Sequence, residues 1–210
     1  MASDPLAFFA ANYGRARVAL IGMGDALGRA VRAGQSGLTS NGQPSLWSHA
    51  FLLGDLRIDR RGAGGALSTS PYLLESDLHV SPIKEQVRNG AQENWVGKWC
   101  TGDLEHAGIF DFNLSSSESD MVLGTALQLI DEELQYPIAE LVGTWLAIVL
   151  KRTWARNPFN DPHALYCSAF VRYCYQQAGR DFMASSPVDL SNTATEHIAQ
   201  SGTFLAEWHR

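Results

Sequence analysis

Hydrophobic residues follow a strand-like pattern in the first half of the chain. Residues 49–60 (HAFLLGDLRIDR) and 71–80 (PYLLESDLHV) are short, mainly apolar segments, and residues 108–114 (GIFDFNL) alternate between apolar and polar side chains. Short runs of this kind, bounded by glycine and polar clusters, are typical of β-strands. The Gly-rich residues 61–68 (RGAGGALS) are typical of a hairpin or a loose connection between the first two strands.

The pattern becomes helical after about residue 117. Ser117 and Asp120 are possible N-caps of a first helix, and Pro137 fits the first turn of a second. A third helix is expected from about Leu165, and it should end before Gly179 because glycine favours the position after a helix. The apolar positions that define the first two helices are Leu123, Leu127, Ile130 and Leu134, then Ile138, Leu141, Val142, Trp145, Leu146 and Val149.

The order of these segments predicts the fold class. Residues 5–33 are expected to be mainly helical or mixed, and the tail, residues 180–210, to be loop plus one short helix. Strands in the middle of a chain followed by helices favour an α+β fold, with helices packed on a mostly antiparallel sheet. A length of 210 residues suits one domain, which we expect to span residues 1–210.

One motif near the start resembles a dinucleotide-binding turn. In VALIGMGDALGRA (residues 18–30) a strand would run into Gly22-x-Gly24, but the third glycine stands at position 28 instead of 27. The acidic residue expected about 20 positions further on for the ribose is missing as well. We therefore interpret this segment as a glycine-interrupted helix or turn, not as a nucleotide site.

Charge and hydropathy exclude several classes of function. The net charge is −6 and the 16 lysines and arginines are scattered, which argues against nucleic acid as a partner. The longest apolar run, residues 141–150, is half the length of a membrane span, so no integral membrane segment is expected. Asp4 stands where a signal peptide carries basic residues, so we expect a chain made in the cytoplasm without a Sec signal.

Cys167 is the first candidate for chemistry. It lies at the expected start of the third helix, where unpaired N–H groups and the helix dipole favour a thiolate and can stabilise an oxyanion. It also belongs to an apolar helical stripe, so a plain core role stays open. Cys174, in the middle of the same helix, is expected in the core. The stripe comprises Cys167, Phe170, Val171, Cys174, Tyr175 and Ala178.

A cysteine nucleophile needs a base and a group that orients the base. His49 is the best-placed histidine because it lies where a polar loop enters an apolar strand; His79 and His106 are weaker alternatives. Glu75, a carboxylate within an apolar strand segment, is the candidate to hold the imidazole, and Asp77 is the second choice.

A zinc site is a weaker possibility. It would combine Cys100 and His106 with Cys167 or Cys174, but no Cys-x-x-Cys or His-x-x-x-His pair supports it. We therefore expect no metal and no organic cofactor. Three cysteines are also too few, and odd in number, for a disulfide framework.

Four short segments together resemble a known family. SLWSHAFLL, YLLESD, YCSAFVRYCYQQAG and SSPVDLSN, spread over residues 45–192, are similar in order and spacing to the circularly permuted NlpC/P60 (papain-like) cysteine hydrolases of the YiiX/YebB-like group. The resemblance implies a permuted papain-like fold, with Cys167 as nucleophile, His49 as base and Glu75 as the orienting acid. Ser48 and Tyr166 would then flank the catalytic positions and line the cleft.

The resemblance also implies a function. It suggests hydrolysis of amide bonds, most naturally in peptidoglycan stem peptides, by a peptidase or amidase. A small acidic chain without a signal is similar to the antibacterial amidase effectors of type VI secretion, which act as toxins in a rival's periplasm. The expected partners are then the secretion apparatus and an immunity protein. Two alternatives stay open: an acyl-lipid thioesterase or acyltransferase that uses the same Cys-His site, and a non-catalytic binding module.

Overall fold

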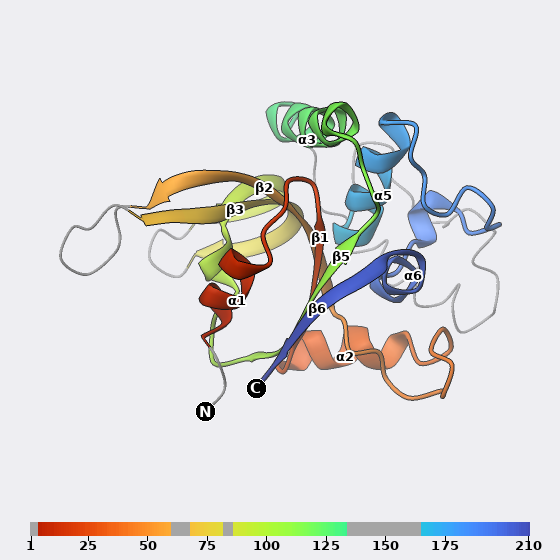
Figure 1. Ribbon diagram of the computed structural model, residues 1–210. Coiled ribbons are helices and arrows are strands. Elements are labelled where there is room, and N and C mark those ends of the chain that lie inside the picture. The colour runs from red at the N-terminus through yellow and green to blue at the C-terminus, as the bar shows by residue number, and fades with distance from the viewer. Residues whose placement is uncertain (1–3, 60–67, 82–85, 134–164) are drawn as a thin grey trace.

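The computed structural model describes residues 4–59, 68–81, 86–133 and 165–210, and the structural statements below refer to these residues. They form a six-stranded antiparallel sheet with the strand order β4-β3-β2-β1-β5-β6 (Figure 1). The strands are β1 (Val18–Met23), β2 (His49–Asp59), β3 (Ser68–Ser81), β4 (Gln86–Trp95), β5 (Leu104–Asp111) and β6 (Thr203–His209). The α-helices are α1 (Pro5–Ala11), α2 (Ala26–Gly34), α3 (Ser116–Asp131), α5 (Cys167–Gln177) and α6 (Thr195–Ser201), with 3₁₀ turns η1 (Val96–Lys98) and η2 (Leu190–Asn192). The predicted α+β fold with a mostly antiparallel sheet is confirmed.

The central strand β1 is buried on both of its faces. Val18 and Leu20 enter a core shared with α3, α5 and α6, while Ala19 and Ile21 enter a second core shared with α1. Figure 1 shows α3, α5 and α6 to one side of the central strands and α1 on the other. The interpretation of residues 18–30 as a glycine-interrupted helix or turn is therefore wrong, because the segment begins with a fully buried strand that has no polar face.

The end of β1 positions the loop that leads into β2. A Cβ on Gly22 would lie 2.0 Å from the backbone oxygen of Leu46, so only glycine allows this loop to pass so close to β1. Asp25 caps α2 by accepting a hydrogen bond from the N–H of Gly28 at 2.6 Å. Both neighbours of β1 are antiparallel, so no βαβ nucleotide-binding unit is formed there.

Besides β1, two more strands were not expected from the sequence. The edge strand β4 is polar and contains a glycine, and its place is set by pairing with β3 along ten residue pairs. The other edge strand, β6, lies in the tail that was expected to be loop plus one short helix; that expectation is corrected by its pairing with β5. Edge strands bury less apolar surface, which weakens their signal in the sequence.

The expected helix boundaries are largely correct. The helix α3 is capped by Ser115, two residues before the earlier of the two expected caps, and Glu118 completes a capping box. The helix α5 begins at Cys167, and Gly179 follows its C-cap with φ +72°, as the sequence predicts. The helix expected around residues 138–149 lies outside the described residues.

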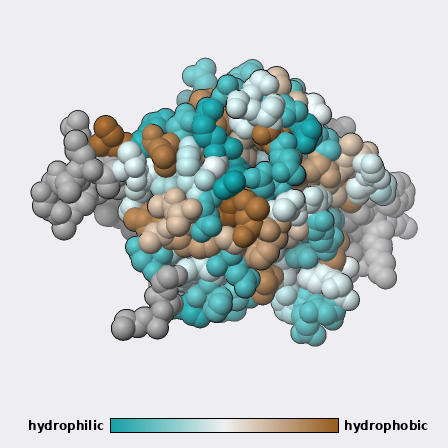
Figure 2. Space-filling model, in the orientation of Figure 1, coloured by the Kyte–Doolittle hydropathy of each residue, from teal (hydrophilic) through white to brown (hydrophobic). Residues whose placement is uncertain are grey.

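Several large apolar residues are exposed on the surface. Figure 2 shows one face as mostly hydrophilic, with small apolar patches between polar side chains. The exposed large apolar residues are Leu27, Leu46, Leu56, Ile58, Met121, Leu127, Phe204 and Leu205. Among the helices that the structure describes, none is long and apolar enough to cross a lipid bilayer.

Candidate active site

Two buried polar side chains meet on neighbouring strands. His49 is the first residue of β2, and Glu75 lies in the middle of β3. Their side chains are 8% and 0% exposed, and His49 Nε2 lies 2.8 Å from Glu75 Oε2. An ionisable pair this deeply buried persists only when its members hydrogen-bond each other or other groups. The structure thus brings together the histidine and the first-choice carboxylate of the sequence prediction.

Cys167 lies beside the same histidine. It is the first residue of α5, it is 4% exposed, and it lies close enough to His49 to raise the pKa of the imidazole. Because Nε2 of the imidazole faces Glu75, the ring nitrogen left for Cys167 is Nδ1. The first N–H groups of a helix have no partner within the helix, and α5 offers these groups beside the thiol. Sulfur, imidazole and carboxylate therefore form a contiguous chain.

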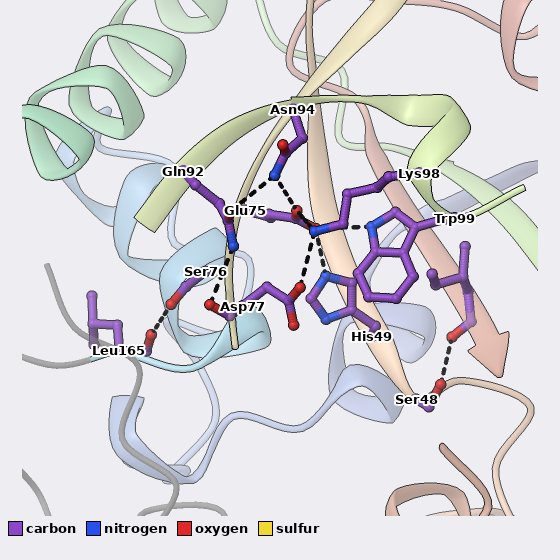
Figure 3. Close-up of polar contacts among 11 residues, drawn as sticks. Ser48, His49, Glu75, Ser76, Asp77, Gln92, Asn94, Lys98, Trp99 and Leu165 are labelled. Atoms are coloured by element: carbon purple, nitrogen blue, oxygen red, sulfur yellow. Dashed lines mark hydrogen bonds and ion pairs between the residues drawn. The ribbon is translucent and has the colours of Figure 1, made fainter. Parts of the chain in front are cut away.

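Glu75 is held by four N–H donors. Its Oε2 accepts hydrogen bonds from His49 and from Trp99 Nε1 at 2.9 Å. Its Oε1 accepts from Asn94 Nδ2 at 3.1 Å and from Lys98 Nζ at 2.5 Å. Figure 3 shows these side chains converging on the carboxylate. A carboxylate with four fixed donors is locked in place and held in its charged form.

Local structure explains how the four donors reach Glu75. Asn94 lies two residues beyond Gln92 on β4, and Gln92 is paired directly with Glu75, so Asn94 shares the face of the carboxylate. The 3₁₀ turn η1 then reverses the chain just after β4 and brings Lys98 and Trp99 back over β3. A 23-residue separation between Lys98 and Glu75 is bridged in this way.

The charges around the site shift the pKa values of Glu75 and His49 in opposite directions. Burial alone would raise the pKa of Glu75, but the charge of Lys98 and the hydrogen bond and charge of His49 lower it to about 2. Burial likewise would lower the pKa of His49, but Cys167 and Glu75 more than offset this and raise it to about 10. The groups on both sides of the imidazole therefore favour its charged form.

The aromatic ring of Trp99 completes the site. Its centroid lies 4.6 Å from that of the His49 ring, at an interplanar angle of 40°. The ammonium of Lys98 lies 4.6 Å from the centroid of the Trp99 ring, in cation–π geometry. Trp99 thus shields one side of the imidazole while its N–H holds Glu75.

The alternative site residues lie elsewhere or play other parts. Asp77 contacts Lys98 Nζ at 2.9 Å, and its carboxylate has no described contact with His49. His106 is on β5, and burial, with the nearby charge of Arg32, lowers its pKa. His79 is on β3, four positions beyond Glu75. In the described part of the chain, the carboxylate beside His49 is therefore Glu75.

Ser48 and Tyr166 were expected to line the cleft, but their side chains are buried and hydrogen-bond the backbone. The Ser48 hydroxyl accepts from the N–H of Met23 at 2.9 Å and donates to a backbone oxygen of β1 at 3.2 Å. The Tyr166 hydroxyl donates to the backbone oxygens of Ser191 and Thr193, at 3.1 and 2.7 Å. Both side chains are buried and fix the backbone next to His49 and Cys167.

The other two cysteines differ from Cys167 in their surroundings. Cys174 is fully buried in the apolar core, as predicted, and burial raises its pKa above the ordinary value. Burial, together with the charge of Asp4, raises the pKa of Cys100 to about 12. Within the described ranges, no three histidine, cysteine or acidic side chains lie close enough together to hold a metal ion.

The sequence prediction missed Lys98, Trp99 and Asn94. The signal available was the short segment WVGKWC (residues 95–100), in which a single lysine stands among aromatic and apolar residues. A lysine in such a setting is often partly buried and paired with a carboxylate. The sequence offers no means to tell which carboxylate that is.

Comparisons with protein-family models and with curated proteins find no match for this chain. Any functional conclusion therefore depends on the chemistry of the Cys167–His49–Glu75 site and on the resemblance of the four sequence segments.

Proposed function

We propose that the chain is a cysteine hydrolase of the permuted papain-like, NlpC/P60 type, with Cys167 as nucleophile, His49 as base and Glu75 as the group that orients His49. The observation that carries the proposal is the juxtaposition of a cysteine at a helix N-terminus, a histidine, and a buried carboxylate held by four donors. A nucleophile, a base within reach and a third orienting group are the recurring parts of such sites.

The reactive form of the site is a thiolate–imidazolium pair, because the thiolate is the nucleophilic form of cysteine. The raised pKa of His49 supports this assignment, because the cation is favoured by Cys167 on one side and by Glu75 on the other. The thiolate attacks the carbonyl carbon of the substrate, and a C–S bond forms as the carbonyl oxygen becomes an oxyanion. The oxyanion is held by the N–H of Cys167, at the first position of α5, where backbone N–H groups have no partner within the helix.

His49 then acts as acid and afterwards as base. Nδ1–H of the imidazolium protonates the leaving amine, so the C–N bond breaks and an acyl-enzyme with a thioester remains. The neutral imidazole next accepts a proton from water, whose oxygen attacks the thioester carbon. The acid product leaves and the Cys167 thiolate is regenerated. Throughout these steps Nε2–H stays hydrogen-bonded to Glu75, which keeps the ring in one orientation.

The substrate class that we propose is the peptide of bacterial peptidoglycan. The support is the order and spacing of the four segments that resemble NlpC/P60 hydrolases, together with the acidic net charge of −6, which argues against nucleic acid. We further propose that the protein is an antibacterial effector that acts in the periplasm of a target cell, with an immunity protein as its partner. The other substrate class open to the same site is the acyl-lipid ester.

Bacterial growth with targeted expression tests this function. The chain is expressed with a periplasmic export signal and, separately, in the cytoplasm, beside Cys167→Ala and the matched control Cys100→Ala. Lysis is expected only for the exported forms that retain Cys167. Equal toxicity of exported Cys167→Ala would overturn catalysis by this thiol. No toxicity of any exported form, with expression verified by immunoblot, would overturn the peptidoglycan assignment.

A second assay separates the remaining substrate classes. Purified protein is incubated with peptidoglycan fragments, or with an acyl-lipid ester, and products are read by mass spectrometry. Release of new amine and carboxyl ends from the peptide is the expected result. Release of fatty acid in place of peptide cleavage would move the assignment to an acyl-lipid hydrolase. No reaction and no alkylation of Cys167 would identify a binding module.

A further inference from the structure

Lys98 is an unusual residue for this part of the molecule. Its side chain is only 15% exposed, although an ammonium group is strongly hydrated and costly to bury. Its Nζ lies between two carboxylates of the same strand, 2.5 Å from Glu75 Oε1 and 2.9 Å from Asp77 Oδ2. The catalytic steps proposed above do not use it. Solubility, the usual role of a surface lysine, does not explain an ammonium group that is buried between two carboxylates.

We propose that Lys98 is a positioning residue of the Cys167–His49–Glu75 site, which clamps Glu75 to Asp77 and sets the charge balance of the thiolate–imidazolium pair. This inference rests on the proposed function. It assigns a role to a residue that makes no described contact with the thiol and that acts through Glu75.

The geometry of the clamp keeps the carboxylate in one orientation. Lys98 and Asn94 hold Oε1, so Oε2 is left to His49 and Trp99. Without Lys98, rotation of the carboxylate would be opposed on the Oε1 side by a single neutral donor. A carboxylate that rotates would release the imidazole from its fixed plane.

The charge of Lys98 acts on every other charged group of the site. The described charged and titratable groups that meet here are His49 from β2, Glu75 and Asp77 from β3, Lys98 from η1 and Cys167 from α5. With all five ionised, two cations face three anions. Removing Lys98 leaves one cation against three anions, so the thiolate becomes harder to form.

The variant Lys98→Met therefore shifts the pH dependence of Cys167 reactivity. In a plot of the alkylation rate of Cys167 against pH, the acid limb is the range in which the rate rises as the thiol ionises. This limb should move to higher pH by about one unit or more, so that at a fixed pH on it the reaction is about tenfold slower. Lys98→Arg keeps the charge and should hold the limb near its original pH. Asp77→Asn removes an anion from the same network, so it should move the limb in the opposite direction, to lower pH.

The experiment is alkylation of the full-length chain by iodoacetamide, read at Cys167 by mass spectrometry across the acid and neutral range. The matched control is Arg57→Met, which removes the half-exposed cation of the Arg57–Glu93 ion pair between β2 and β4, the two strands on either side of β3. Its profile should coincide with that of the original chain. If Lys98→Met does not fold, the shift to lower pH expected for Asp77→Asn, beside an unchanged profile for Lys98→Arg, still tests the charge effect.

The outcomes separate the two proposals. A limb that stays in place in Lys98→Met and in Asp77→Asn, with Cys167 still activated, would overturn the role of Lys98 alone. Loss of stability without any shift of the limb would show a purely structural lysine and would overturn it too. If Cys167 in the original chain reacts no faster than in His49→Gln, the proposed function itself fails.

Discussion

Replacing Glu75 with glutamine tests whether a buried negative charge holds this site together. Glutamine preserves the size of the side chain and one oxygen, but it removes the charge and converts one acceptor oxygen into an NH₂ donor. Each carboxylate oxygen of Glu75 accepts two N–H groups in the native protein. Whichever way the amide turns, its NH₂ group must therefore face two other donors.

The size of the effect follows from burial. Breaking a buried ion pair by removing one partner costs about 3–5 kcal/mol, because the other charge is left uncompensated. Glu75 is 0% exposed, and the Lys98 partner is 15% exposed. We expect Glu75→Gln to lower the free energy of unfolding by about 3–5 kcal/mol. This is a large part of the roughly 5–15 kcal/mol that stabilises a typical protein.

Urea denaturation followed by tryptophan fluorescence measures this loss. Asp77→Asn is the matched control, since it removes the same kind of charge from the same strand but leaves Glu75 to pair with Lys98. Its loss should be clearly smaller because Asp77 is 15% exposed and makes one described ion pair. Equal losses in the two variants, or a loss in Glu75→Gln below about 1 kcal/mol, the range of an exposed ion pair, would refute the reasoning.

Three further predictions concern the scaffold and the ionisation of His49. Gly22→Ala should destabilise by about 1–3 kcal/mol because its Cβ would clash with a backbone oxygen, whereas Gly124→Ala, with open space around it, should be neutral or stabilising by up to about 1 kcal/mol in denaturant titrations. Arg172→Met should cost about 3–5 kcal/mol, since it breaks a buried bidentate ion pair, and Arg15→Met, at an exposed pair, about 0–1 kcal/mol. The folded pKa of His49, about 10, lies above its ordinary 6.5, so its stabilisation is complete below pH 6.5 and is lost as pH rises towards 10. Melting temperatures across that window should fall less in His49→Gln than in the original chain, and parallel curves would contradict the raised pKa.

The sequence predicted the parts of the fold whose signals are local. The apolar residues of β2 and β3 and the helical spacing of α3 and α5 were sufficient to place those elements. The strand β1 was misread because its six residues are buried on both faces, so no alternation marks it. The edge strands β4 and β6 were missed because pairing with a neighbour, more than their own residues, decides their conformation.

The candidate site, like the fold, was predictable only where the sequence signal is local. Cys167 was identifiable from its place at a helix start, and His49 from its place at a strand start. The contacts of Glu75 were not, because Asn94, Lys98 and Trp99 reach it from elements 19 to 24 residues away in the sequence. The choice between Glu75 and Asp77 depended on which side chain turns towards His49, and the strand period cannot tell them apart.

Alkylation of native Cys167 tests the central claim most directly. At about pH 6, well below the ordinary cysteine pKa of about 8.5, an unactivated thiol reacts slowly with iodoacetamide. The account predicts that Cys167 alone is modified under these conditions, that Cys100 and Cys174 are spared, and that His49→Gln slows the reaction at least tenfold, the equivalent of about one pKa unit. A native Cys167 that resists modification, or that reacts equally fast in His49→Gln, would contradict the account.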